Sequence, residues 1–422
     1  MLLIKNATIV LGEYVNTIEK EKQDYLFMTD ILVKDEKIIK IQKNIFISKS
    51  VRRNLITIDA EYKYVIPGIV DPHCHMRDPG FTNKEDFITG SKSCIRGGVT
   101  TFLDMPNTSP LTITKENLEL KRKNSLNRSY SDYGFHFGGS KEDNSSEISQ
   151  VSHEVASTKI FLNASTGDML IEDNKVLENI FFESSIVSFH AEDEKVKTAI
   201  DLSEKFNAPI YLCHISTEKE LEFIKKAKMK GLSIFSEVTP HHLFLNERSR
   251  EISDLNNKLL RMKPELKTSE DNESLWEGLD SGLIDVVGTD HAPHTLEEKL
   301  ESTVFGIPGV EHSLEMMLNG VNEKKITMYT LIRAMSINPA KIFKIKNKGK
   351  IEYGYDGDFI ILDMDEQTTI TNDEVISKCG WTPYNGMKRG GKILTTILRG
   401  NIVYDKGIFF DLLGKEVEYK KN

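Results

Sequence analysis

The chain has 422 residues, of which 39% are hydrophobic and 28% are charged, a composition typical of a globular protein with a large buried core. Its formal net charge of −9 argues against non-specific binding to nucleic acid or to anionic membrane surfaces. The sequence has no secretory signal, no apolar run near the roughly 18 residues of a membrane helix and no CxxC pair among its scattered cysteines, so we expect a cytoplasmic protein with reduced thiols.

Both ends of the chain have the pattern of half-buried antiparallel strands. Residues 2–10 and 30–42 alternate apolar and polar side chains, which is the period of a strand with one solvated face. The end of the chain repeats this alternation, with Gly and Asp turns between the apolar stretches. We therefore predict one small β domain, assembled from residues 1–60 and 345–422.

The middle of the chain predicts a parallel barrel. Short apolar runs recur there, each followed by a helical stretch, and near-continuous apolarity is typical of strands buried on both faces. Eight such runs occupy residues 64–75, 99–107, 133–139, 157–163, 185–193, 208–216, 232–240 and 284–293. Strands that alternate with helices in this way predict an α/β fold, a (β/α)8 TIM-like barrel over residues 61–344.

Side chains with metal-binding chemistry stand at the ends of these predicted strands. They are His73 and His75 in the first run, Lys159 in the fourth, His190 in the fifth, His214 in the sixth and Asp290 in the eighth. A single strand-end histidine is more often a satisfied polar residue than a ligand, but the HxH period of two places both imidazoles on one side. Because the C-terminal ends of barrel strands meet at one mouth, this set predicts a metal site there.

The number of metal ions depends on Lys159. Four imidazoles and one carboxylate exceed what a single tetrahedral zinc with an open position needs. Two divalent ions roughly 3.5–4 Å apart would use all of them if a bridging ligand were available. A lysine that has reacted with carbon dioxide becomes an anionic carbamate and can bridge. The alternative is an ordinary lysine paired with Asp290 at the mouth of the barrel, and the residues alone leave both open.

Five segments carry a resemblance to a known family. They read PGIVDPHCHMRDPG at 67–80, KEDFITGSKSCIRGGVTTFLDMPNTSP at 84–110, KIFL at 159–162, EVTPHHL at 237–243 and GTDHAPHTLEEK at 288–299. Together they resemble the dihydroorotases of the amidohydrolase superfamily, and the resemblance spans essentially the whole chain. The segments GDFIILDMD and SKCGWTPYNGMK resemble the β-sandwich portion that closes the family's fold. The strand-end motifs mark the superfamily, whereas DMPN and the arginine after HxH are more specific to dihydroorotases.

The resemblance implies a binuclear metal centre, with zinc as the expected metal. It implies that one ion is bound by His73, His75 and Asp290 and the second ion by His190 and His214. Lys159, as a carbamate, would bridge the two ions. STKIFLNASTGDML, at 157–170, resembles the class I-like, lysine-bearing branch and favours the carbamate. A metal-bridged hydroxide would then attack the cyclic amide of dihydroorotate, with Asp290 as general base and then acid. The product would be N-carbamoyl-aspartate, and the reverse direction would serve pyrimidine biosynthesis.

The resemblance also implies contacts to substrate. Arg77 lies two residues beyond His75, on the same face of the strand, and offers a bidentate fork to the substrate carboxylate. Asn107 in DMPN and His294 in DHAPH match side chains that contact substrate in the family, and Gly309 matches a backbone contact to the ring amide. Taken without the resemblance, Asn107 is also a turn former and His294 an ordinary loop residue.

A lid and one departure from the family pattern complete the candidate site. In the lysine-bearing branch the loop after the bridging lysine can close over substrate, which makes Ser165 and Thr166 candidate lid residues; a surface turn without a role is the alternative. Where the family often has a substrate-binding Asn before a Pro, this chain has Lys263, which offers a point charge in its place. Five further histidines are expected to be structural: His136, His153, His241, His242 and His312.

Three functions compete on these observations, and dihydroorotase activity is the leading expectation. Another cyclic amidohydrolase, an allantoinase or hydantoinase, would not need an arginine carboxylate anchor at position 77. A catalytically inactive dihydroorotase-like subunit that scaffolds a partner would have lost metal ligands, and all are present here. We expect a small-molecule substrate, neither nucleic acid nor membrane as a partner, and a homodimer by default; aspartate transcarbamoylase is the candidate protein partner.

Overall fold

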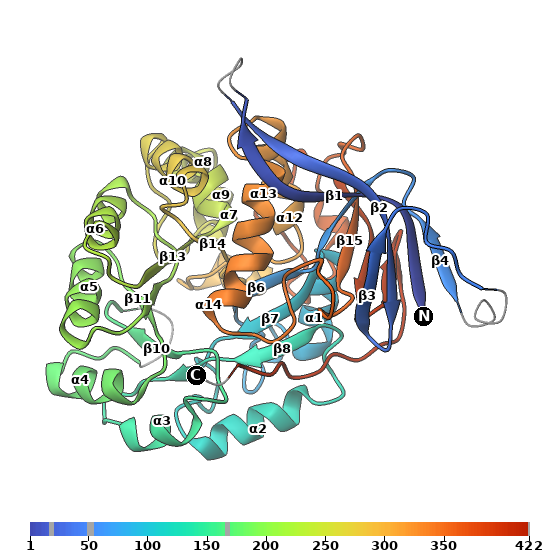
Figure 1. Cartoon of the computed structure of the whole chain (residues 1–422). Coiled ribbons are helices and arrows are strands. Elements are labelled where there is room, and N and C mark those ends of the chain that lie inside the picture. Colours follow the sequence, from blue (N-terminus) through green and yellow to red (C-terminus); the bar gives the residue numbers. More distant parts are fainter. Residues whose placement is uncertain (17–20, 49–54, 165–168, 421–422) are drawn as a thin grey trace.

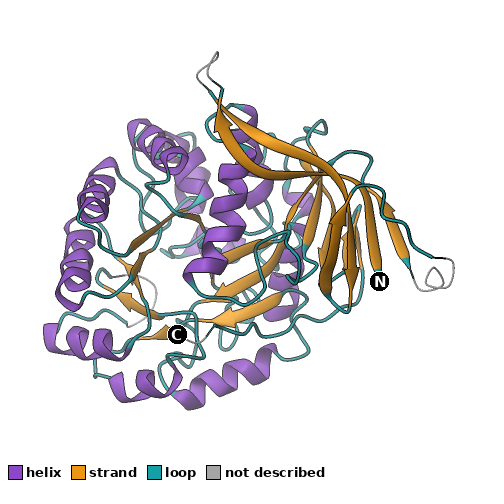
Figure 2. Ribbon diagram, viewed as in Figure 1, coloured by secondary structure: helices purple, strands orange, loops and turns teal. Residues whose placement is uncertain are grey.

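The computed structural model describes residues 1–16, 21–48, 55–164 and 169–420. These residues form a barrel of parallel strands with helices around it, and a large mixed sheet made from both ends of the chain lies beside the barrel (Figure 1). Figure 2 shows the same division by secondary structure, with the helices gathered around the barrel and the long strands on its flank. The fold is therefore the predicted α/β barrel with an added β-sandwich domain.

The added domain is built on a mixed sheet in which early and late strands of the chain pair directly. In spatial order its strands are β18 (Ile408–Phe409), β17 (Asn401–Asp405), β16 (Lys392–Leu398), β15 (Phe359–Asp363), β5 (Tyr64–Pro67), β1 (Leu2–Val15), β2 (Lys22–Lys34) and β3 (Lys37–Gln42), and β4 (Ile56–Asp59) also pairs with β1. The antiparallel pair β15–β5 joins the two ends of the chain. Apolar residues of these strands, such as Ile4, Ile31 and Phe359, share one buried cluster, which explains their alternating pattern.

The barrel follows the predicted order of apolar runs. Its strands are β6 (Ile69–Cys74), β7 (Val99–Asp104), β8 (Asp132–Phe135), β9 (Phe137–Gly138), β10 (Thr158–Phe161), β11 (Val187–His190), β12 (Ile210–Leu212), β13 (Ile234–Val238) and β14 (Val286–Val287). β8 and β9 flank His136 and occupy one strand position. Each paired neighbour is parallel. A bridge between Cys74 and His291 brings the first strand beside the segment that follows the last.

Helices lie around the barrel and in the loops at its C-terminal end. They are α1 (Phe87–Arg96), α2 (Lys115–Ser125), α3 (Ser145–Val151), α4 (Asn174–Glu183), α5 (Glu194–Phe206), α6 (Glu218–Met229), α7 (Pro240–Phe244), α8 (Glu247–Glu251), α9 (Asp254–Leu259), α10 (Ser269–Ser281), α11 (Leu296–Glu301), α12 (Ser313–Asn322), α13 (Met328–Ile332) and α14 (Asn338–Ile342). Several begin at a capping side chain, as α6 does at Thr217 and α10 at Thr268. Among the helices of the described ranges, none has the length and apolarity needed to span a membrane.

One predicted barrel strand is divided between the two domains. The run 64–75 was expected to be a single strand, but β5 pairs in the added sheet and β6 pairs in the barrel. Gly68 separates them, and a Cβ atom there would lie 2.1 Å from Oγ1 of Thr100. Only glycine allows the chain to pass this close to β7 as it moves from one sheet to the other.

The C-terminal residues do not all lie in the added sheet. Between β15 and β16, the chain leaves the sheet and packs on the loops at the C-terminal end of the barrel. The apolar cluster formed there contains Leu245, Leu260, Met262, Leu266, Ile307, Met316, Ile370, Cys379, Trp381 and Tyr384. Trp381 also donates its indole N–H to the carbonyl of His294, at 2.9 Å. Residues 370–384 therefore help to build the wall around the mouth of the barrel. Their sequence pattern did not predict this position.

A buried lysine ties the barrel to the added domain. Nζ of Lys348 lies 2.6 Å from Asp132 of β8 and 2.7 and 3.0 Å from Asp358 and Asp356. These three aspartates have the spacing of a cation site, but the ammonium group already supplies the positive charge there. Removing one partner from such a buried ionic group typically costs about 3–5 kcal/mol, so the cluster has a structural role.

Candidate metal centre

A small cleft opens at the C-terminal ends of the barrel strands. Most of the predicted site residues line it: His73, His75, Arg77, Asn107, Lys159, His190, His214, Lys263 and Asp290. Phe161, Ala292, Phe305 and Gly306 complete the lining. Residues from the first and last strands of the barrel therefore share one small space, as the convergence of parallel strand ends predicts. Ser165 and Thr166, the candidate lid residues, lie outside the described residues.

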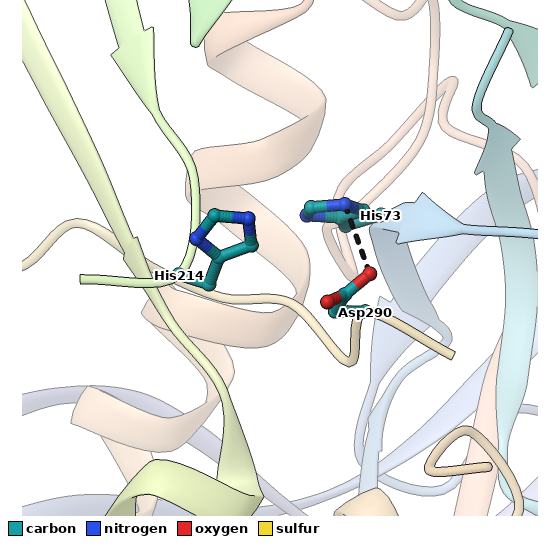
Figure 3. Close-up of side chains that lie close together, drawn as sticks. All are labelled: His73, His214 and Asp290. Atoms are coloured by element: carbon teal, nitrogen blue, oxygen red, sulfur yellow. Dashed lines mark ion pairs between the residues drawn. The ribbon is translucent and has the colours of Figure 1, made fainter. Parts of the chain in front are cut away.

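The first histidine pair points at one carboxylate. Nε2 of His73 lies 3.2 Å from Oδ1 of Asp290, and Nε2 of His75 lies 2.9 Å from the same oxygen. His73 lies near the end of β6, His75 immediately follows this strand, and Asp290 follows β14. The three groups meet because the segments that follow these two strands lie side by side. Figure 3 shows the His73 and His214 rings and the Asp290 carboxylate turned toward a common space.

The second histidine pair lies on the next side of the cleft. Nδ1 of His190, at the end of β11, lies 2.9 Å from Nε2 of His214, which follows β12. Both rings are buried. Nδ1 of His214 has no hydrogen-bond partner in the described part of the chain, whereas Nε2 of His190 lies 3.4 Å from Oε1 of Glu192. The His214 ring also lies 5.4 Å from that of His73, centroid to centroid, so the two pairs form one cluster.

Burial keeps these imidazoles neutral. It lowers the pKa of His73, His75 and His214 well below the ordinary value, and it lowers the pKa of His190 as well. A neutral imidazole has a free lone pair, which is the form that binds a metal. Ligand atoms of His73, His214 and Asp290 all lie within 4.8 Å of one another. Neutral imidazoles and a carboxylate, with Nδ1 of His214 buried and without a hydrogen-bond partner among the described residues, fit a divalent transition metal such as zinc.

Lys159 stands at the floor of the cleft with no ion pair to Asp290 within 4.0 Å among the described contacts. Its Nζ atom donates to Sγ of Cys213 at 2.8 Å, and its side chain is almost completely buried. Burial raises the pKa of Cys213 to about 12, so this partner is a neutral thiol. The predicted alternative, a lysine paired with Asp290, is therefore not what the structure contains. The structure therefore places a buried amine beside the candidate ligands.

Arg77 is held in place before any substrate arrives. Its Nε atom donates to the carbonyl of Pro293 at 3.1 Å, and one terminal nitrogen lies 3.2 Å from Nε2 of His294. Burial lowers the pKa of Arg77 to about 10, which still leaves it charged at neutral pH. Burial, followed by the Arg77 charge, lowers the pKa of His294 to about 3, so His294 stays neutral and can accept a hydrogen bond from Arg77. His294 thus lies beside the cleft and orients the arginine.

Of the other predicted substrate contacts, Asn107 and Lys263 line the cleft and Gly309 does not. Oδ1 of Asn107 lies 2.7 Å from Nδ1 of His75, so the Asn107 side chain contacts a candidate ligand as well as lining the cleft. The N–H of Gly309 donates to Nδ1 of His291 at 3.1 Å, which places it behind the cleft wall. Lys263 lines the cleft with its Nζ atom 5.2 Å from the ring centroid of Phe305.

Sequence patterns missed three groups that touch the ligand cluster. Oε1 of Glu192 lies 3.4 Å from Nε2 of His190. Oε1 of Glu237 lies 2.7 Å from Nδ1 of His73, and Cys213 accepts from Lys159. Burial raises the pKa of Glu237 to about 7, and a hydrogen bond from Tyr211 opposes the rise. The available signal was a charged residue inside the apolar strand of EVTPHHL, which was quoted only as part of a family motif.

Comparisons with known proteins show the family to which the chain belongs. The sequence pattern of the amidohydrolase family matches residues 64–403. The dihydroorotase of Pyrococcus horikoshii is 39% identical over 84% of this chain and 83% of its own length, and that of Methanosphaera stadtmanae is 35% identical over 95% and 96%. The solved L-hydantoinase (dihydropyrimidinase) from Arthrobacter aurescens superposes with a TM-score of 0.89 at 28% identity and covers 99% of both chains. The two relatives named above are dihydroorotases, and the chain belongs to the amidohydrolase family.

Proposed function

We propose that this chain is a dihydroorotase, which hydrolyses the cyclic amide of dihydroorotate to N-carbamoyl-aspartate and catalyses the reverse ring closure. The observation that carries the proposal is the shared cleft, in which the histidine cluster and Asp290 lie with the buried cation Arg77. A ring amide needs an activated nucleophile, and the carboxylate of dihydroorotate needs a fixed positive partner. The names of the relatives, given above, support the same substrate.

Two divalent ions, with zinc the expected metal, would complete the site. His73, His75 and Asp290 would hold one ion, His190 and His214 the other, and Lys159 as a carbamate would bridge them. When bound, such ions polarise a carbonyl oxygen and lower the pKa of a bound water to about 7, which supplies a nucleophile at neutral pH. The metal dependence of the family and the neutral imidazoles of the cleft support this assignment.

The remaining steps belong to the side chains of the protein. The Asp290 carboxylate receives the proton that the attacking water loses, and it returns this proton to the ring nitrogen as the carbon–nitrogen bond breaks. Arg77 binds the substrate carboxylate through its guanidinium group, which Pro293 and His294 hold in position. Asn107 keeps the His75 ring oriented through its contact with Nδ1. Lys263 adds a second positive charge to the cleft on the side of Phe305.

Replacing Lys159 by Ala tests the carbamate bridge. We expect the variant to bind clearly less than the two ions per chain expected of the wild type and to lose activity, because no other group of the cleft offers a bridging anion in that place. Acetate or propionate should restore part of both, since a small carboxylate can occupy the vacated space. Lys263→Ala is the matched control, a lysine of the same cleft whose loss should leave both ions bound. A fully metallated and active Lys159→Ala protein would rule the bridge out.

A hydantoinase-like activity is the second candidate, because the L-hydantoinase structure covers nearly all of both chains. The position of Arg77 favours a substrate with a carboxylate over a neutral ring. Relative rates on dihydroorotate, dihydrouracil and hydantoin, measured with purified, zinc-loaded protein, separate the two functions. The homodimer and the association with aspartate transcarbamoylase stay predictions, tested by light scattering of the chain alone and of a mixture with that enzyme.

A further inference from the structure

Glu237 is the one carboxylate among the described residues that contacts both halves of the candidate metal centre. It lies on β13, at the inner side of the barrel, and its side chain is completely buried. Oε1 lies 2.7 Å from Nδ1 of His73, and the same oxygen accepts the backbone N–H of His214 at 3.0 Å. The carboxylate does not line the cleft itself. It therefore lies behind the ligands and not among them.

Two further groups fix where this carboxylate can be. The hydroxyl group of Tyr211 donates to Oε2 at 2.7 Å. Gly288 leaves the space that the carboxylate occupies, because a Cβ atom there would lie only 2.4 Å from Oε2 and 2.7 Å from the carboxyl carbon. Tyr211 and His214 both donate to this side chain. In its ionised form the carboxylate has no proton to give, so Nδ1 of His73 is then the donor in the third contact.

We propose that Glu237 is a positioning residue of the metal centre, and the proposal rests on the metal centre of the proposed function. By accepting from Nδ1, it holds His73 in the tautomer whose Nε2 lone pair faces Asp290 and the cleft. By accepting from the backbone of His214, it also holds that residue in its left-handed conformation, with φ at +37°. One carboxylate thereby contacts both ligand sets. Tyr211 holds this carboxylate in place through a hydrogen bond, and Gly288 leaves the space for it.

Zinc binding to metal-depleted protein tests this role without any use of activity. Groups that orient a metal ligand typically contribute about 10- to 100-fold in metal affinity. Glu237→Leu removes every acceptor and should weaken zinc binding by about 100-fold, whereas Glu237→Gln keeps an oxygen for His73 and should lose about 10-fold. Tyr211→Phe leaves the contacts of Glu237 with His73 and His214 intact, so its zinc affinity should fall less than that of either Glu237 variant. Glu220→Gln is the matched control, a buried glutamate that caps α6 and contacts none of the candidate ligands.

Gly288→Ala separates position from charge. It leaves the carboxylate in the protein but fills the space that Oε2 occupies, so zinc affinity should fall as it does in Glu237→Leu. Nitrogen-15 NMR of labelled histidines in the metal-depleted proteins should show the Nδ1–H tautomer for His73 in the wild type and its loss in both variants. Thermal unfolding of the metal-depleted proteins shows whether each variant is folded.

Zinc binding by the wild type and by the variants distinguishes an error in the role of Glu237 from an error in the proposed function. If the wild type binds two zinc ions and folded Glu237→Leu binds them equally tightly, the positioning role is wrong while the proposed function stands. If Gly288→Ala keeps wild-type affinity and the wild-type His73 tautomer, the role of the carboxylate's position is wrong. If the wild type binds no zinc or other divalent ion, the metal centre itself is wrong, and this inference falls with it.

Discussion

Replacement of Asp290 by Asn should lower kcat for dihydroorotate hydrolysis by about 10²- to 10⁴-fold, the usual contribution of a general acid–base group. Asn has nearly the same shape and can still bind a metal through its oxygen, but it cannot carry a proton from water to the ring nitrogen. The same loss should appear in the cyclisation of N-carbamoyl-aspartate, because both directions pass through the same proton transfers. Steady-state rates in each direction, with the metal content of every sample measured, check this expectation.

Asp285→Asn is the matched control for this substitution. Asp285 immediately precedes β14, at the opposite end of the same strand, where its Oδ2 atom lies 2.6 Å from Nζ of Lys228. The control makes the same chemical change on the same segment, far from the cleft, and should leave kcat within a few-fold of the wild type. If Asp290→Asn turned over dihydroorotate at the wild-type rate with both ions bound, Asp290 would not be the proton carrier.

Removal of the Arg77 guanidinium group should reduce kcat/KM for dihydroorotate by roughly 30-fold or more. Truncating one member of a buried, hydrogen-bonded charge pair costs about 2–5 kcal/mol, and about 1.4 kcal/mol corresponds to tenfold. Arg77→Met tests this loss, and Arg77→Lys, which keeps the charge but not the bidentate fork, should fall between Met and the wild type. The methyl ester of dihydroorotate, which lacks the negative charge, should lose far less with either variant.

Lys263→Met provides the comparison within the same cleft. If Arg77 alone anchors the carboxylate, Lys263→Met should change kcat/KM by only a few-fold. An Arg77→Met protein with unchanged kcat/KM for dihydroorotate would place the carboxylate elsewhere and would remove the main reason to prefer this substrate over neutral rings.

The parts of the fold that local pattern determines were predictable. Apolar runs such as 187–190 and 210–212 lie between helices, and burial on both faces leaves few arrangements besides a parallel barrel. The candidate ligands were predictable for the same reason, because His73, His190 and Asp290 stand where barrel strands end. Their meeting in one cleft follows from topology and needs no knowledge of side-chain packing.

What the sequence did not reveal depends on contacts between distant segments. The division of the run 64–75 at Gly68 follows from its approach to Thr100, a contact that no local period records. The wall that Trp381 builds beside His294 comes from a segment with no regular pattern. Glu237 was missed because a charged residue within a strand usually faces solvent, and here only Tyr211, His214 and Gly288 together make its burial acceptable.

The most direct test of the proposed function is a single assay with purified, zinc-loaded protein and dihydroorotate, followed by the loss of substrate absorbance and by chromatography of the product. We expect hydrolysis to N-carbamoyl-aspartate and cyclisation of N-carbamoyl-aspartate by the same enzyme, loss of both activities after chelation, and recovery when about two equivalents of zinc are returned. Protein that carries its metal ions but converts neither compound, while it opens dihydrouracil or hydantoin, would contradict the proposed function.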